Sequence, residues 1–190
     1  MFQYRCHSHV NKIIYHFMKT IVVFVTTLDG KITKWGDPHV HRWSSKEDQT
    51  YFKKTWSESP LIIMGSGTFD FAPIKPTLNQ LLVIMTKNPA KYKQYEVAGQ
   101  LEFSDESPRE LTERFKAIGY KQMLVAGGPH VATSFFKNKL VDELWLTLEP
   151  KIFGKGGNFV IEEELDVELK QISLEKINDQ GTMIVKYEVV

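Results

Sequence analysis

Short apolar runs rich in Val, Ile and Leu alternate with segments of helical periodicity along most of the chain. The apolar runs predict β-strands at about residues 20–27, 61–64, 80–86, 122–126 and 142–148. Segments with helical spacing predict helices at about residues 46–57, 108–118 and 130–138. After about residue 158 the pattern predicts strands with no helix between them, as in residues 183–189. This order predicts an α/β fold of three layers (αβα), with a mostly parallel sheet and an antiparallel C-terminal edge.

Residues at the ends of two predicted helices support these boundaries. The stretch Ser44-Ser45-Lys46-Glu47 has the spacing of a Ser-x-x-Glu capping box, with Glu47 as its acidic member. Ser107-Pro108 provides an N-cap and a first-position proline for the second helix, which Gly119 is expected to end.

Composition and charge narrow the class of protein. The chain has 190 residues, 42% of them hydrophobic, which is ordinary for one globular domain. Because 24 basic residues nearly balance 23 acidic ones, no net field favours nucleic acid or an anionic membrane, and the apolar runs are too short to span a bilayer. A single cysteine, Cys6, excludes an intrachain disulfide framework, and no Cys/His spacing resembles a zinc site. We therefore expect one domain over residues 18–190, without a metal and in a reducing cytoplasm.

Residues 1–17 do not fit the strand–helix pattern. They contain Cys6 and three histidines but no continuous apolar stretch of the kind found in signal peptides. We interpret them as an N-terminal extension outside the fold. The alternative, a His/Cys metal site, lacks a second cluster of ligands.

Two strands end in glycine. The run 61–64 leads into Gly65-Ser66-Gly67-Thr68, and the run 123–126 leads into Gly127-Gly128-Pro129. Ligands of open α/β sheets bind at the carboxyl ends of the strands, and glycine there lets backbone N–H groups approach a phosphate. We call these two segments, residues 65–68 and 127–129, the glycine exits. They lie about sixty residues apart in the sequence, which suggests that they hold one dinucleotide from two sides.

The common nucleotide motifs do not fit these glycines. A Rossmann fingerprint needs Gly-x-Gly-x-x-Gly, whereas the third glycine is absent after Gly65 and Gly67 and also after Gly127-Gly128. A P-loop is also absent, because residues 154–157 lack its leading glycine and its trailing Ser or Thr. An ordinary dehydrogenase or kinase site is therefore not expected.

Residues 43–55, followed by Ile62-Ile63-Met64-Gly65-Ser66-Gly67-Thr68-Phe69, resemble dihydrofolate reductase. Four further stretches resemble the reductase domain of the bacterial riboflavin-synthesis deaminase–reductase, the RibD C-terminal domain; they are Thr27–Ile32, Ala126–Pro129, Leu140–Leu144 and Pro150–Gly154. The matches run in the same order over nearly all of residues 18–160. The resemblance implies a dihydrofolate-reductase-like fold, NADPH as cofactor, and hydride transfer to a C=N bond of a heterocyclic substrate.

The resemblance also implies roles for the glycine exits. Thr68 would contact the NADPH phosphates, and the glycine pair would form a second turn under the pyrophosphate and nicotinamide. The predicted cofactor-binding residues are Gly65, Ser66, Gly67, Thr68, Gly127, Gly128, Pro129, His130 and Val131. Pro129 would start a helix whose first-turn N–H groups favour an anion. The alternative for 65–68 is a plain turn.

On the substrate side, the resemblance makes Asp48 the catalytic acid. Hydride addition to an imine places negative charge on nitrogen, so a nearby proton donor lowers the barrier, and a carboxyl on an apolar-lined helix can have a raised pKa. The alternative is that Asp48 only complements the helix dipole. Phe52 and Lys53 are further predicted substrate-binding residues, although Phe52 could instead fill core.

Two more substrate contacts, Asp29 and Trp43, are predicted with open alternatives. Asp29 could form a loop at the mouth of the site or simply make a turn. Trp43 could stack beside the nicotinamide or anchor its loop in the core.

Departures from both families leave the substrate open. No Arg lies between Arg42 and Arg109 to bind the folate glutamate, and Ala126 stands where riboflavin reductases have a substrate-binding Glu. Lys53 and Lys54 are the nearest equivalents of the arginines that bind the substrate phosphate. The primary hypothesis is a reductase of 5-amino-6-(5-phosphoribosylamino)uracil type. The alternatives are a dihydrofolate or pterin reductase and a non-catalytic nucleotide-binding module. The resemblance also implies a homodimer.

Overall fold

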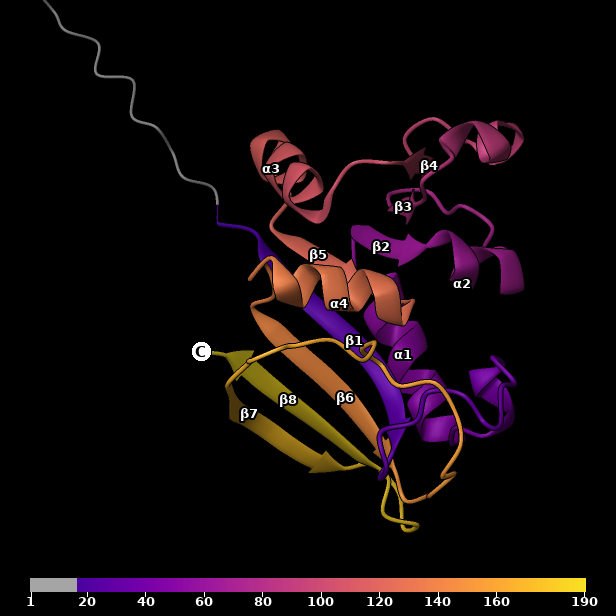
Figure 1. Ribbon diagram of the computed structural model, residues 1–190, viewed down its shortest axis with the longest axis vertical. Helices are drawn as coiled ribbons and strands as arrows, with labels where there is room; N and C mark the ends of the chain where they lie inside the picture. Colours follow the sequence, from indigo (N-terminus) through magenta and orange to yellow (C-terminus); the bar gives the residue numbers. More distant parts are fainter. Residues whose placement is uncertain (1–16) are drawn as a thin grey trace, which may run out of the picture.

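The computed structural model describes residues 17–190, so the predicted extension lies outside the described residues except for its last position. The described part forms an eight-stranded sheet in the order β4-β3-β2-β5-β1-β6-β8-β7 (Figure 1). The strands are β1 (Lys19–Thr27), β2 (Leu61–Gly65), β3 (Leu81–Met85), β4 (Leu101–Ser104), β5 (Gln122–Val125), β6 (Glu143–Glu149), β7 (Leu169–Lys176) and β8 (Met183–Val189). Strands β1 to β6 pair in parallel, whereas β8 pairs antiparallel with β6 and β7. The predicted antiparallel C-terminal edge is confirmed.

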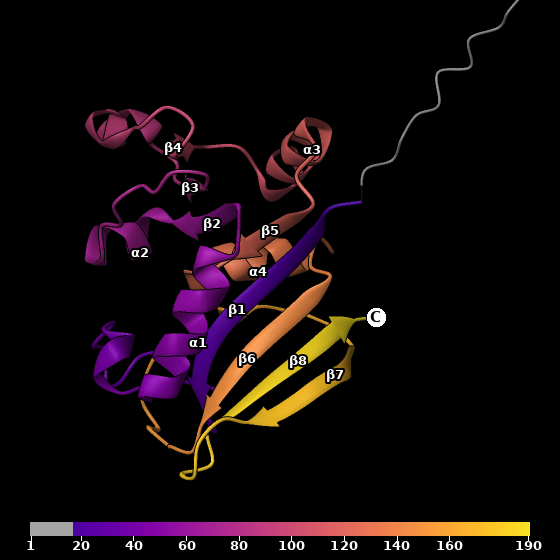
Figure 2. The same cartoon turned by 180° about the vertical axis from the view of Figure 1, so that it is seen from behind.

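Helices cover both faces of this sheet, which confirms the three-layer prediction. Helix α1 (Lys46–Ser57) lies on one face, whereas α3 (Pro108–Ile118) and α4 (Pro129–Lys137) lie on the other (Figures 1 and 2). The central strands direct alternate side chains into two cores, one on each face of the sheet. Ile63 of β2 packs in the core under α3 and α4, and its neighbour Ile62 packs in the core under α1.

The central strands and the helices match the predicted boundaries closely, because fully buried strands leave continuous apolar runs in the sequence. Four other elements were not predicted: β4, the short helix α2 (Ser66–Phe71), and the 3₁₀ helices η1 (Val40–Arg42) and η2 (Pro89–Tyr95); β7 lies in the tail where strands were expected, but its bounds were not predicted. Strand β4 has only four residues, and every residue of β7 is exposed. Neither strand therefore has the buried apolar run on which the prediction depended.

One predicted cap was wrong. The N-cap of α1 is Ser45, whose side chain accepts the backbone N–H of Asp48, so Ser44 and Glu47 do not form the capping box. Two adjacent serines made either register plausible in the sequence. The cap of α3 is as predicted, with a complete capping box from Ser107 to Glu110 and a left-handed Gly119 at its end.

The sheet has a switch point between β1 and β5. These neighbouring parallel strands lead to helices on opposite faces, β1 to α1 and β5 to α4 (Figures 1 and 2). Connections that diverge in this way leave a crevice at the carboxyl ends of the strands, which is where ligands of open α/β sheets bind.

Candidate active site

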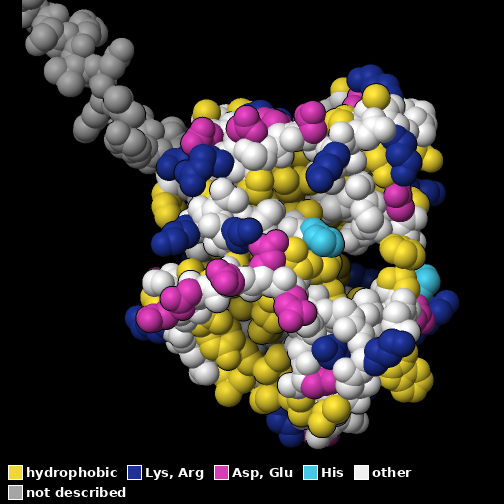
Figure 3. Space-filling view, viewed as in Figure 1, with side chains coloured by type: hydrophobic (Ala, Val, Ile, Leu, Met, Phe, Trp, Pro, Cys, Tyr) yellow, Lys and Arg dark blue, Asp and Glu magenta, His cyan; other side chains and the backbone are white. Residues whose placement is uncertain are grey.

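A cavity of about 860 Å³ opens at this switch point. Its wall combines the carboxyl ends of β1, β2, β3 and β5, the buried side of α1, and the starts of α2 and α4. Figure 3 shows a notch in the surface between the part of the molecule that contains α2 and the loop that follows β1. A cavity of this size suits a small-molecule ligand.

The two glycine exits meet in the wall of this cavity. The backbone N–H of Gly65 donates to the carbonyl of Gly127 at 3.3 Å. A Cβ at Gly127 would lie 3.2 Å from Thr68 Cγ2, and a Cβ at Gly65 would lie 3.0 Å from Val131 Cγ2. Side chains at these positions would therefore crowd the junction between α2 and α4.

Gly128 is required for a different reason. Its backbone has φ 80° and ψ 121°, a conformation that side-chain-bearing residues rarely adopt. It is also the N-cap of α4, and its carbonyl accepts the N–H of Ala132. All nine predicted cofactor-binding residues line the cavity. The structure thus brings together two segments that are far apart in the sequence, beside the N-terminus of a nine-residue helix.

Asp48 lies on the opposite wall, in the first turn of α1. Only 3% of its surface is exposed. Burial raises the pKa of its carboxyl, the hydroxyls of Thr147 and Ser44 act in the opposite direction, and the nearby Glu149 carboxylate raises the pKa further. The outcome is a carboxyl that keeps its proton to a higher pH than an exposed aspartate does.

The four predicted substrate-binding residues divide into two pairs. Phe52 and Lys53 line the cavity on the same helix as Asp48. Asp29 and Trp43 are not in its wall, and each has a local role.

The Asp29 carboxylate accepts the N–H groups of Phe153 and Gly154, and it also accepts the hydroxyl of Thr27. The hydrogen bond from Thr27 is the largest cause of the lowered pKa of Asp29. Asp29 thus joins the loop after β1 to the loop after β6. Trp43 is buried and packs edge-on against Phe153, with 5.2 Å between the ring centroids. These placements favour the turn and core alternatives.

Several residues of the cavity were missed by sequence reasoning. Thr86 and Lys87, which follow β3, line the part of the cavity beyond the glycine exits. They are joined there by Ser104 at the end of β4 and by Asp105 and Glu106, which follow it. Nearer to Asp48, His41 and Gln49 complete the wall. Residues that follow strand ends could have been identified from the strand boundaries, but β4 itself was not predicted.

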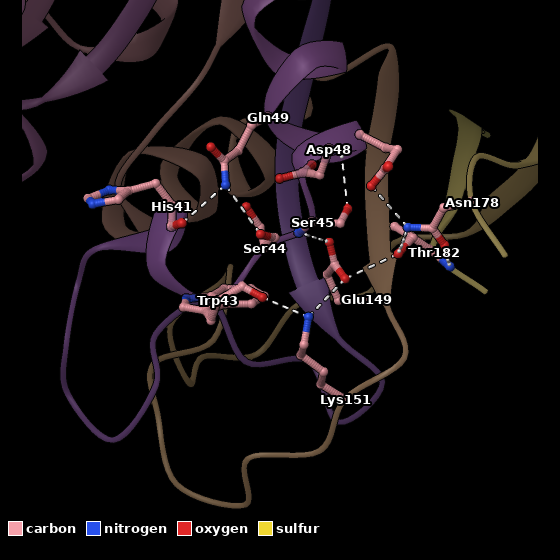
Figure 4. A network of polar contacts seen from close by, with 11 residues as sticks. His41, Trp43, Ser44, Ser45, Asp48, Gln49, Glu149, Lys151, Asn178 and Thr182 are labelled. Carbon is pink, nitrogen blue, oxygen red and sulfur yellow. Dashed lines mark hydrogen bonds and ion pairs between the residues drawn. The ribbon is translucent and has the colours of Figure 1, made fainter. Parts of the chain in front are cut away.

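A polar network beneath Asp48 was also missed (Figure 4). Its centre is Glu149, a buried carboxylate at the end of β6 that accepts the N–H of Ser45 and pairs with Lys151. Burial alone would raise the pKa of Glu149, but these hydrogen bonds outweigh it and the pKa lies below its ordinary value. A single acid at the end of an apolar strand gives little sign of such a role in the sequence.

Metal clusters and membrane-spanning helices are both absent from the described residues. Within residues 17–190 no group of three or more His, Cys, Asp or Glu side chains is arranged to hold a metal ion. No helix in the same part of the chain is long and apolar enough to cross a membrane.

Comparison with known proteins found a matching family model and several solved structures of similar fold. Residues 18–183 match the family model described as the RibD C-terminal domain. A putative riboflavin biosynthesis protein from Shewanella sp. PV-4 superposes with a TM-score of 0.72 at 21% identity, covering 91% of this chain and 99% of that one.

Two further structures share the fold. A diaminohydroxyphosphoribosylaminopyrimidine deaminase/5-amino-6-(5-phosphoribosylamino)uracil reductase from Thermotoga maritima gives a TM-score of 0.72 at 18% identity, covering 92% of this chain and 57% of that one. Dihydrofolate reductase from Enterococcus faecalis, complexed with NADP(H), gives 0.61 at 20% identity over 91% of this chain and 98% of that one. At these identities the likenesses establish the dihydrofolate-reductase-like fold.

Proposed function

The chain belongs to the RibD C-terminal domain family, and from that membership and the site geometry we propose that it is an NADPH-dependent reductase. Its substrate would be an aminopyrimidine of the 5-amino-6-(5-phosphoribosylamino)uracil type, reduced at a C=N bond. The observation that supports this most is that one cavity has the paired glycine exits on one wall and a buried carboxyl on the other.

The residues present fit a dinucleotide. A Cβ at Gly65 or Gly127 would crowd Val131 or Thr68, whereas glycine leaves the backbone free to form the cradle that a phosphate would need. Thr68 adds a hydroxyl, and the first-turn N–H groups of α4 add the positive end of a helix dipole. When bound, NADPH would supply a hydride to the substrate carbon.

Asp48 would supply the matching proton. Hydride addition to the carbon of the C=N bond would leave the electron pair of that bond on nitrogen, and this nitrogen would take its proton from the Asp48 carboxyl. Burial raises the pKa of this carboxyl, so it keeps its proton to a higher pH than an exposed aspartate does. Phe52, one turn further along α1, would pack against the flat heterocycle.

A second candidate is a dihydrofolate or pterin reductase. The spacing of Asp48, Phe52 and Lys53 on α1 supports it, and so does the fold shared with the NADP(H) complex of dihydrofolate reductase. The described lining of the cavity contains no arginine. Lys53 is therefore the side chain on α1 that would face either a substrate phosphate or a folate carboxylate.

We further propose a soluble cytoplasmic homodimer. Strand β7 ends the sheet, and its exposed side chains include Leu169, Ile172 and Leu174. An apolar edge strand favours association with another chain. Size-exclusion chromatography with light scattering gives the mass directly, and a monomer at micromolar concentration would contradict this proposal.

The decisive assay follows the reduced-nicotinamide absorbance in the presence of each candidate substrate. We expect NADPH loss with the ribosylaminopyrimidine phosphate and a slower rate, or none, with dihydrofolate. Preference for dihydrofolate would support the second candidate. Saturable NADPH binding without turnover of either compound would favour a nucleotide-binding module, and no binding would reject all of these functions.

A further inference from the structure

Glu149 is the most deeply buried acid of the described chain, with 1% of its surface exposed. It is the last residue of β6, and both of its carboxylate oxygens accept hydrogen bonds (Figure 4). Oε1 accepts the N–H of Ser45 at 2.6 Å, and Oε2 accepts from Lys151 Nζ at 3.1 Å and from Thr182 Oγ1 at 3.2 Å. A buried carboxylate with this many donors is held in one place.

These contacts connect Glu149 to Asp48 through the start of α1. Ser45 is the N-cap of the helix, and its hydroxyl accepts the N–H of Asp48 at 3.2 Å. Thr147 lies two residues before Glu149 and therefore points to the same face of β6, where its hydroxyl lies beside the Asp48 carboxyl. One face of β6 thus contacts both the backbone of the first turn of α1, through Glu149, and the side chain of Asp48, through Thr147.

The same contacts place two opposite charges beside Asp48. Lys151 Nζ also donates to the carbonyl of Trp43 at 2.7 Å, which fixes the cation next to the start of α1. The charged groups that act on the pKa of Asp48 are Glu149, the last residue of β6, and Lys151, two residues after it; Asp48 in turn raises the pKa of Tyr51 on its own helix. The carboxylate of Glu149 and the ammonium of Lys151 therefore have opposite effects on the pKa of Asp48.

We propose that Glu149 is a positioning residue, which fixes the Asp48 carboxyl in the cavity through Ser45 and balances the charge of Lys151 beside it. The catalytic consequence rests on the proposed function, because Asp48 is the proton donor there. The contacts and charges around Asp48 can be tested in the protein without cofactor or substrate.

The test is the titration of the Asp48 carboxyl by ¹³C NMR in the full chain, without cofactor or substrate, with the signal assigned by its loss in Asp48→Asn. In Glu149→Gln the charge of Lys151 is left unopposed, so Asp48 is expected to titrate about one pH unit lower. In Lys151→Met the charge of Glu149 is left unopposed, so Asp48 is expected to titrate about one pH unit higher. Opposite shifts are not expected from a general loosening of the fold.

Glu47→Gln is the matched control. Glu47 precedes Asp48 on the same helix turn, but it is exposed and contacts Asn178 instead. Because solvent screens an exposed charge, this variant is expected to leave the titration of Asp48 nearly unchanged.

Equal titrations in all variants, or shifts of the same sign in Glu149→Gln and Lys151→Met, would overturn the proposal. If Glu149→Gln does not fold, Lys151→Met decides alone, and an unchanged titration in that variant overturns it. The pH profile of kcat should follow the NMR shifts. If the shifts occur but NADPH does not bind, the proposed function fails while the positioning role stands.

Discussion

Replacing Gly128 by alanine adds a single methyl group at the junction of the two glycine exits. The Cβ would lie 3.4 Å from Thr68 Oγ1, which is an ordinary contact, so crowding adds little. The cost comes from the backbone, because φ 80° with ψ 121° is outside the regions that alanine favours. Such a residue is strained by about 1–3 kcal/mol, so we expect the melting temperature to fall by roughly 2–4 °C for each kcal/mol.

The same strain should weaken cofactor binding. A shift of this turn, which lies against Thr68, would relieve the strain and would displace the proposed cradle for the pyrophosphate. We expect the Kd for NADPH to rise about tenfold or more, equivalent to about 1.4 kcal/mol. The assay is a fluorescence titration of NADPH beside a thermal melt of the same sample.

Gly119→Ala is the matched control. Gly119 also has a positive φ, 102°, and no atom lies within 4 Å of the position that a Cβ would take, but it caps α3 away from the cavity. It should lose about 1–2 kcal/mol of stability with unchanged NADPH affinity. Wild-type affinity in Gly128→Ala, or an equal loss of affinity in both variants, would refute the role of the glycine turn.

Three further predictions concern Asp48, Ser107 and Asp29. Because burial raises the pKa of Asp48, ionisation of this carboxyl at high pH costs stability. Asp48→Asn should therefore raise the free energy of unfolding in urea at pH 8, by about 1.4 kcal/mol for each pH unit by which folding raises that pKa. The gain should vanish below about pH 4, where the carboxyl is protonated in both states. Ser107→Ala should cost about 1 kcal/mol through loss of the α3 cap, with NADPH affinity unchanged. Asp29→Ala removes the acceptor of the Gly154 N–H, so hydrogen exchange at Gly154 should become faster, and an unchanged rate would contradict the link between the two loops.

The sequence predicted those parts of the fold that bury continuous apolar runs. Strands such as β2 are buried along their whole length, and α3 has clear capping residues at both ends, so local patterns determine their boundaries. Strand β7 is exposed along its whole length, and its place depends on pairing with β8 rather than on a core face. Its existence is decided by tertiary contacts that local reasoning does not include.

The candidate site divides in the same way. The glycine exits and Asp48 stand in short segments that resemble known families, so their place in one cavity could be predicted. The role of Glu149 could not, because its partner Ser45 is 104 positions away in the chain. A charge buried by long-range contacts looks in the sequence like any acid at a strand end.

We propose that this cavity holds reduced nicotinamide next to the substrate, so that hydride passes directly between them. The experiment uses NADPH that bears deuterium at C4, with each face labelled in turn, and measures the mass of the reduced aminopyrimidine. We predict one deuterium per product molecule from one face only, with Asp48→Asn slowing the reaction without changing that label. Product without deuterium from either face, or no product under saturating NADPH, would exclude direct hydride transfer from NADPH to this substrate.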